Sequence, residues 1–238
     1  MTNKEFVKKL IDVAKNYKTL YVMGCFGMPM TTENKKTIIK HHSYNQAPDR
    51  MAMINNASDD TFGFDCVNLL KSILWGWNGD KSKKYGGAKY ATNGVPDVNA
   101  NGMIAKCLDV STDFSNIEVG EAVWCPGHIG VYIGDGLAVE CTPTWKNCVQ
   151  ITACNCAKSG YDRRNWVKHG RLPYITYEKV ESKKLETGND IVWELMNGKH
   201  KIKIDDVKRA VTALDKAKTN QEYMSLYWIL YKLVNGNG

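Results

Sequence analysis

The hydrophobic pattern of the chain begins at helical spacing. One broad helical face collects the apolar residues Phe6, Leu10, Ile11, Val13, Ala14 and Tyr17. Thr2 precedes this run and Glu5 lies three residues after Thr2, which is the spacing of a capping box. We therefore predict an N-terminal helix that is capped by Thr2.

A second apolar run lies between two polar stretches. Residues 27–61 are polar and irregular, and we interpret them as a long surface insertion. Residues 78–116 are rich in glycine and read as loops. Between them, residues 64–77 are strongly apolar and predict a buried helix with Asp65 at its N-terminus.

From Ile117 the pattern changes to that of short strands. The predicted strands are 121–124, 128–133 and 137–142, with further short ones around 149–151 and 170–172. Gly134, Asp135 and Gly136 form a turn between the second and third of these. Because helices come first and antiparallel strands follow, we predict an α+β fold.

The composition shifts again after Tyr177. A charged, linker-like stretch over 178–184 precedes three short helical segments at 190–196, 205–216 and 221–234. We therefore predict two domains, 1–176 and a small three-helix domain over 177–238. Its aromatic residues either stack on sugars of a cell wall or pack the bundle, and they are Trp193, Tyr227, Trp228 and Tyr231.

The charge of the chain allows several partners and selects none. A formal charge of +7 favours polyanionic surroundings such as nucleic acid, anionic lipid or wall polymers. The basic residues are scattered and interleaved with acidic ones, so a solvated surface is the default interpretation, and we assign no nucleic-acid partner. No secretory signal peptide is visible, and no stretch approaches the roughly 18 apolar residues of a membrane span.

Eight cysteines without a signal peptide indicate a reduced pool of thiols. Four of them crowd a short stretch at Cys141, Cys148, Cys154 and Cys156. Their spacing lacks the paired Cys-x-x-Cys form of structural zinc sites, and no histidine lies among them. We therefore predict free thiols, with no metal and no cofactor.

Three residues make a plausible nucleophilic site. Cys66 falls in the first turn of the predicted buried helix, where the positive field of the helix N-terminus favours thiolate over thiol. His128 opens a hydrophobic strand, and a turn over 134–136 places it opposite Thr142. Glu140 is then the diagonal neighbour of His128, within reach of the distal ring nitrogen, while the proximal nitrogen faces the thiol.

This arrangement resembles a known family. Phe64-Asp65-Cys66 before an apolar helix is similar to the nucleophile motif of the NlpC-type papain-like cell-wall cysteine peptidases. Residues 120–124 and 128–136 resemble the histidine block of that family, and Tyr21-Val22-Met23-Gly24 resembles its upstream Tyr-x-x-Gly element. The resemblance covers roughly residues 5–175, and the insertion, the charge and the absent signal peptide are most like a bacteriophage endolysin.

The sequence departs from the family pattern at three places. Val67-Asn68 stands where the family usually has Ser-Gly, and Glu140 stands where a histidine is most often found. About forty residues separate the upstream element from the nucleophile, whereas the family has almost none, so the insertion reshapes the expected cleft.

The resemblance implies a papain-like core, with helices packed on an antiparallel sheet, and acyl transfer without a cofactor. Cys66 is then the nucleophile, His128 its base and Glu140 the residue that orients the ring. The substrate-binding candidates are Tyr21, Asp65, Trp75 and Trp124. For the two tryptophans, a place in a glycan cleft and a place in the core both remain open.

The implied substrate is an amide bond of bacterial peptidoglycan, within the stem peptide or between muramic acid and L-alanine. The C-terminal domain would add anionic wall polymers as partners. The protein would be made in the host cytoplasm and act on the wall after release. Two other classes fit the same residues: a non-catalytic wall-binding protein of this fold, and an intracellular thiol hydrolase or acyltransferase.

Overall fold

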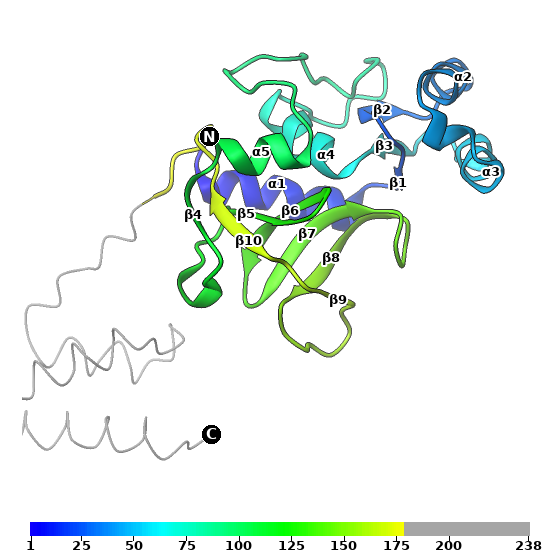
Figure 1. Ribbon diagram of the computed structural model, residues 1–238. Coiled ribbons are helices and arrows are strands. Elements are labelled where there is room, and N and C mark those ends of the chain that lie inside the picture. The colour runs from blue at the N-terminus through cyan, green and yellow to red at the C-terminus, as the bar shows by residue number, and fades with distance from the viewer. Residues whose placement is uncertain (179–238) are drawn as a thin grey trace, which may run out of the picture. The chain divides into compact units, whose positions relative to one another are not determined.

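The computed structural model describes residues 1–178, and they form an α+β unit, as predicted (Figure 1). Its helices are α1 (Asn3–Asn16), α2 (Thr32–His41), α3 (Pro48–Asn56), α4 (Cys66–Leu74) and α5 (Ala100–Lys106), with the short 3-10 helices η1 (Ser43–Gln46) and η2 (Phe114–Asn116). The predicted helical domain over 177–238, with its proposed sugar-stacking residues, lies outside the described residues from 179 on.

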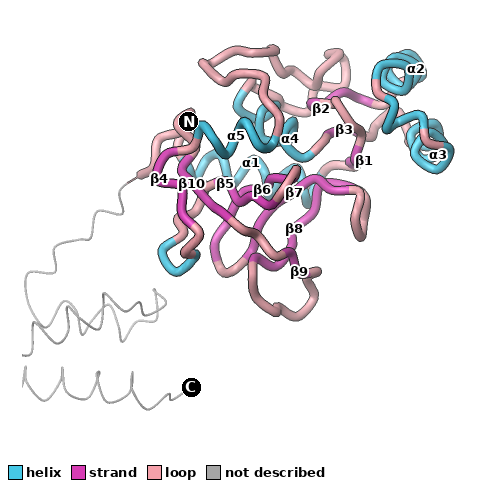
Figure 2. The backbone as a smooth tube through the Cα atoms, in the orientation of Figure 1, coloured by secondary structure: helices cyan, strands magenta, loops and turns pink. Residues whose placement is uncertain are grey.

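Within residues 1–178, ten strands lie in two sheets (Figure 2). The small sheet has the order β1-β3-β2 and consists of β1 (Thr19–Tyr21), β2 (Phe26–Pro29) and β3 (Phe62–Phe64). The large sheet has the order β4-β10-β5-β6-β7-β8-β9 and consists of β4 (Leu108–Ser111), β5 (Ala122–Cys125), β6 (His128–Gly134), β7 (Leu137–Thr142), β8 (Cys148–Cys154), β9 (Arg163–Arg164) and β10 (Lys168–Arg171). The large sheet is antiparallel except where β9 runs parallel to β8.

The N-terminal helix has the predicted capping box. Thr2 Oγ1 accepts the backbone N–H of Glu5 at 3.2 Å, and the Glu5 carboxylate accepts the backbone N–H of Thr2 at 2.9 Å. These two bonds satisfy amide donors that the first turn of a helix leaves without a partner. The apolar face of α1 is buried through Phe6, Leu10 and Val13, and it packs with α4 in the main core.

The main core lies between these two helices and one face of the large sheet. Alternate strand residues such as Ala122, Ile129, Val131 and Val139 point into it. Every residue of α4 is buried, because the helix is enclosed by α1, the large sheet and the small sheet. The small sheet delivers the chain to this helix, since β3 ends two residues before Cys66.

The insertion over 27–61 is more regular than predicted. It contains β2, α2, η1 and α3, and the two helices lie beside each other next to the small sheet (Figure 1). Their polar sequence hid them, because only Ile38 of α2 and Ile54 of α3 are buried apolar side chains. Local start signals were present, since Thr31 caps α2 and Pro48 opens α3. The stretch over 78–116 likewise holds α5, η2 and β4.

The hairpin of β6 and β7 has the predicted main register and a shorter turn. Gly130 pairs with Glu140 and Val131 with Val139, but Gly134 pairs with Leu137, with an irregularity after Tyr132. The loop therefore has two residues rather than the predicted three. Asp135 and Gly136 both have positive φ, 55° and 67°, as a tight hairpin turn requires. Among residues 1–178, no helix has the length and apolarity needed to cross a membrane.

Candidate functional site

Cys66 is the first residue of α4, and Asp65 is its N-cap. The Asp65 carboxylate accepts three N–H groups: the backbone of Asn68 at 2.8 Å, the side chain of Asn68 at 2.6 Å and the backbone of Gly24 at 2.9 Å. Asp65 was a candidate for substrate binding, but its side chain is buried and its bonds connect the start of α4 to the segment after β1. Its position therefore serves the placement of the nucleophile.

The Cys66 thiol lies close to the start of β6. Its sulfur accepts the backbone N–H of Ile129, the residue that directly follows His128. Burial, followed by the charge of Asp65, raises the pKa of the Cys66 thiol to about 12. Backbone N–H groups at the helix start lower this pKa, but less than burial raises it. The predicted preference for thiolate is therefore wrong for the resting protein, because desolvation outweighs the helix field.

His128 and Glu140 make the predicted diagonal contact across the β6–β7 hairpin. The two are joined by a hydrogen bond of 2.6 Å between His128 Nε2 and Glu140 Oε2. The side chain of His128 is 14% exposed and that of Glu140 is fully buried. Because Nε2 faces the carboxylate, Nδ1 is the ring nitrogen that remains for proton transfer with a thiol.

Glu140 is bound by more groups than the sequence indicated. Thr152 Oγ1 donates to Oε1 at 2.7 Å, and Arg164 Nε donates to both oxygens at 2.9 and 2.7 Å. Burial by itself raises the pKa of the Glu140 carboxyl, but the hydrogen bonds and charges of His128 and Arg164 lower it overall. Glu140 is therefore a buried carboxylate in its ionised form.

Trp166 covers the ring of His128. The two rings stack with centroids 5.5 Å apart and planes 11° apart. Neither Trp166 nor Arg164 was predicted from the sequence to belong to the site. The only local signal was the cluster of basic and aromatic residues over 161–166, which carries no fixed spacing to His128.

Tyr21 is the last residue of β1 and lies near Cys66. Burial, followed by the negative charge of a Cys66 thiolate, raises the pKa of the Tyr21 hydroxyl, so the two groups are close. The Tyr21 ring packs edge-on against Tyr44 at 6.0 Å, and the Arg50 guanidinium lies 5.5 Å from the centre of each ring. Since Tyr44 and Arg50 belong to the insertion, the insertion forms part of the surroundings of the nucleophile.

The two candidate tryptophans have different environments. Trp75 is 1% exposed, and its indole N–H donates to the carbonyl of Val95 at 3.0 Å, so it belongs to the core. Trp124 is half-buried and donates to Asn101 Oδ1 at 3.0 Å. The same oxygen accepts the N–H of Gly127 at 3.2 Å, so Asn101 holds the turn that precedes His128.

The clustered cysteines are all free thiols, at positions 141, 148, 154 and 156. Within residues 1–178, no group of three or more His, Cys, Asp and Glu side chains has an arrangement that would hold a metal ion. Cys141 is fully buried and donates to the carbonyl of Phe64 at 3.3 Å, which joins β7 to the end of β3.

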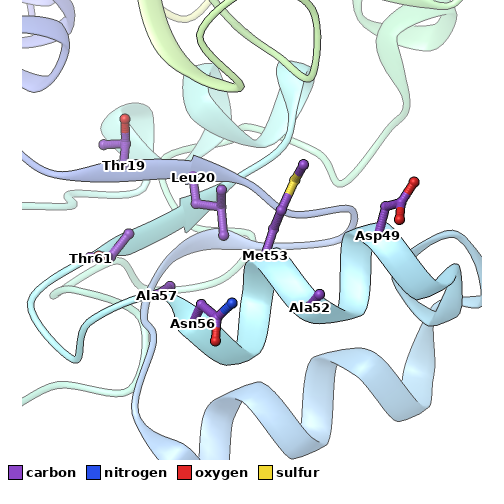
Figure 3. Close-up of a pocket in the computed structure, with 8 residues that line it drawn as sticks. All are labelled: Thr19, Leu20, Asp49, Ala52, Met53, Asn56, Ala57 and Thr61. Carbon is purple, nitrogen blue, oxygen red and sulfur yellow. The ribbon is translucent and has the colours of Figure 1, made fainter.

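A cavity of about 590 Å³ lies between β1 and α3 (Figure 3). It is lined by Thr19, Leu20, Asp49, Ala52, Met53, Asn56, Ala57 and Thr61. Met53 on this lining lies 3.6 Å from Arg50 Nη1, while Cys66, His128 and Glu140 are not among the lining residues.

Comparison of the sequence with protein-family models and with curated proteins found no match. Thiol-dependent acyl transfer requires a cysteine nucleophile, a histidine base close to it and a group that orients the histidine ring. Here these groups are a cysteine at a helix start, a histidine next to the peptide group that the thiol binds, and a buried carboxylate on Nε2 of that histidine.

Proposed function

We propose that this protein is a cysteine hydrolase with a papain-like core that cleaves an amide bond in bacterial peptidoglycan. The observation that carries the proposal is the order Cys66, His128, Glu140 in space. The Cys66 sulfur accepts a hydrogen bond from the backbone N–H of Ile129, which follows His128. His128 Nε2 is hydrogen-bonded to the buried Glu140 carboxylate at 2.6 Å. This arrangement leaves Nδ1 as the base.

The high pKa of Cys66 favours a particular sequence of steps. In the resting protein Cys66 is a neutral thiol, because burial disfavours its charged form. His128 Nδ1 takes the thiol proton as the sulfur attacks the scissile carbonyl, and Glu140 stabilises the imidazolium that forms. Backbone N–H groups at the start of α4 are suited to bind the oxyanion. The imidazolium then protonates the leaving amine, and His128 activates a water that releases the acyl group.

Peptidoglycan as the substrate rests on the sequence motifs rather than on the geometry. Phe64-Asp65-Cys66 and the histidine block over 128–136 resemble those of wall peptidases. The formal charge of +7 suits a polyanionic bacterial wall. An endolysin-like role, with release to the wall after synthesis in the host, is the biological setting that we propose.

Purified Gram-positive walls provide the test. The native chain should lower the turbidity of a wall suspension, and mass spectrometry of the soluble fragments should identify the new termini and thus the bond. Cys66→Ala should not clear the walls. Cys156→Ala is the matched control, because Cys156 is a half-buried thiol on a loop after β8, and it should clear walls at the native rate.

Two outcomes would favour a different function. Sedimentation with the walls without clearing would favour a non-catalytic wall-binding protein of the same fold. If the chain neither binds nor clears walls from several species, an intracellular thiol hydrolase or acyltransferase becomes the better hypothesis.

A further inference from the structure

The carboxylate of Glu140 accepts hydrogen bonds from three side chains. His128 Nε2 binds Oε2 at 2.6 Å, Thr152 Oγ1 donates to Oε1 at 2.7 Å, and the single Nε–H of Arg164 is shared between Oε1 and Oε2 at 2.9 and 2.7 Å. Each carboxylate oxygen is therefore bound by two partners. Both oxygens are shared by Arg164, which fixes the plane of the carboxylate and not only its charge.

Arg164 is itself immobilised. Its Nη2 donates to Thr142 Oγ1 at 3.2 Å, on the strand that carries Glu140. Its guanidinium lies 4.8 Å from the ring centre of Trp145 and 5.6 Å from that of Trp166. A side-chain hydrogen bond also joins Arg164 to Cys125. Stacking on two indoles while donating to Glu140, Thr142 and Cys125 uses the planar, forked shape of a guanidinium, which an ammonium group lacks.

The same contacts reach His128 by a second route. Trp166, under the guanidinium, stacks on the His128 ring at 5.5 Å. It fits there because Gly130, two residues after His128, has no side chain: a Cβ at this position would lie 3.0 Å from the Trp166 ring. Arg164 therefore limits the movement of His128 through Glu140 on one ring edge and through Trp166 on one ring face.

We propose that Arg164 is a positioning residue of this site, which holds Glu140 and Trp166 so that the His128 ring keeps Nε2 on the carboxylate and Nδ1 available as the base. The contribution of Arg164 to catalysis rests on the proposed function, whereas its effect on the orientation of the His128 ring does not. A catalytic histidine that samples other ring orientations or tautomers spends less time in the reactive geometry.

The test compares Arg164→Lys with Arg163→Lys in the full chain. Lysine keeps the positive charge at 164 but lacks the planar group whose Nε binds the carboxylate while Nη2 binds Thr142. Arg163 is the matched control, because it is the neighbouring residue, its side chain is exposed, and its Nε donates to Asn165 Oδ1 at 2.9 Å, away from Glu140.

The first readout needs no substrate. Nitrogen-15 spectra of the histidine rings, with His128 assigned from His128→Gln, should show a single tautomer with a proton on Nε2 in the native chain and in Arg163→Lys. In Arg164→Lys the His128 nitrogens should shift toward an average of the two tautomers, and the Nε2 proton should exchange with water at least about tenfold faster. An Arg164→Lys spectrum identical to the native one would overturn the proposal.

The second readout is wall clearing. Arg164→Lys should reduce the maximal rate at least about tenfold, with the wall concentration for half-maximal rate changed by less than about twofold, since no substrate contact is removed. If the native chain fails to clear walls while the ring spectra change as expected, the proposed function fails and the positioning role stands. If circular dichroism shows that Arg164→Lys is unfolded at 25 °C, Arg164 is structural only, and the proposal is wrong.

Discussion

Replacing Arg164 by methionine should destabilise the protein in a way that depends on pH. Arg164→Met keeps the length of the side chain but removes the hydrogen bonds to Glu140 and Thr142 and the charge that faces Glu140. Glu140 is fully buried, so its carboxylate would lose its cationic partner inside the protein. Breaking a buried ion pair on one side costs about 3–5 kcal/mol. Thr152 and His128 still donate to the carboxylate, so we expect the lower end, about 3 kcal/mol at pH 7.

The sign of the pH effect follows from the lowered pKa of Glu140. A carboxyl whose pKa is lower in the folded state adds stability above its ordinary value of 4.5 and loses it as the pH falls through the folded-state pKa. The difference in free energy of unfolding between the native chain and Arg164→Met should therefore be largest near pH 7 and shrink below the ordinary value.

Thermal and urea unfolding at several pH values would measure this difference. About 3 kcal/mol corresponds to a fall in Tm of roughly 6–12 °C for a chain of this size. Arg163→Met is the control and should change stability by less than about 0.5 kcal/mol, because Arg163 is exposed. A loss that is equal for both variants, or one that does not change with pH, would show that Arg164 does not stabilise the ionised Glu140 carboxylate.

Three further results are expected. The rate of iodoacetamide alkylation at Cys66 should rise about tenfold per pH unit from pH 7 to 10, because burial raises the thiol pKa to about 12. Peptide mass spectrometry would measure this rate, and a plateau below pH 7 would instead indicate a preformed ion pair of thiolate and imidazolium. Gly130→Ala should lower the free energy of unfolding by about 1–3 kcal/mol in urea. The reason is that a Cβ there would lie 2.8 Å from the carbonyl oxygen of Val139 and 3.0 Å from the Trp166 ring. An unchanged urea midpoint would contradict this close packing at Gly130. Asp65→Ala should cost about 2 kcal/mol, the upper end for a lost helix cap, because the carboxylate also binds Gly24, and the same unfolding assay would detect it or rule it out.

Local rules made part of the site predictable from the sequence. The helix start at Cys66 follows from an apolar run that is preceded by Asp65, and the structure begins α4 at that residue. The contact between His128 and Glu140 follows from strand register, and the turn is short enough to fix that register within one residue. Both depend on residues close together in the chain.

The rest depends on long-range packing. Arg164 reaches Glu140 only because β9 adds parallel to β8, and no local spacing encodes that pairing. The pKa of Cys66 is set by how deeply α4 is buried, which a sequence pattern does not reveal. The helices of the insertion were missed for the opposite reason, since they bury too little apolar surface to produce a clear period, with Ile38 and Ile54 as their buried apolar residues.

The release of new amino groups from purified peptidoglycan would show directly whether Cys66 hydrolyses a wall amide bond. The native chain and Cys66→Ala would be compared at equal concentration on walls with blocked amines. We expect steady release by the native chain and a rate lower by roughly 10³-fold or more for Cys66→Ala, because the nucleophile carries the reaction. Equal release by the two proteins would contradict Cys66 as the nucleophile, and no release by either on walls from several species would contradict the proposed substrate.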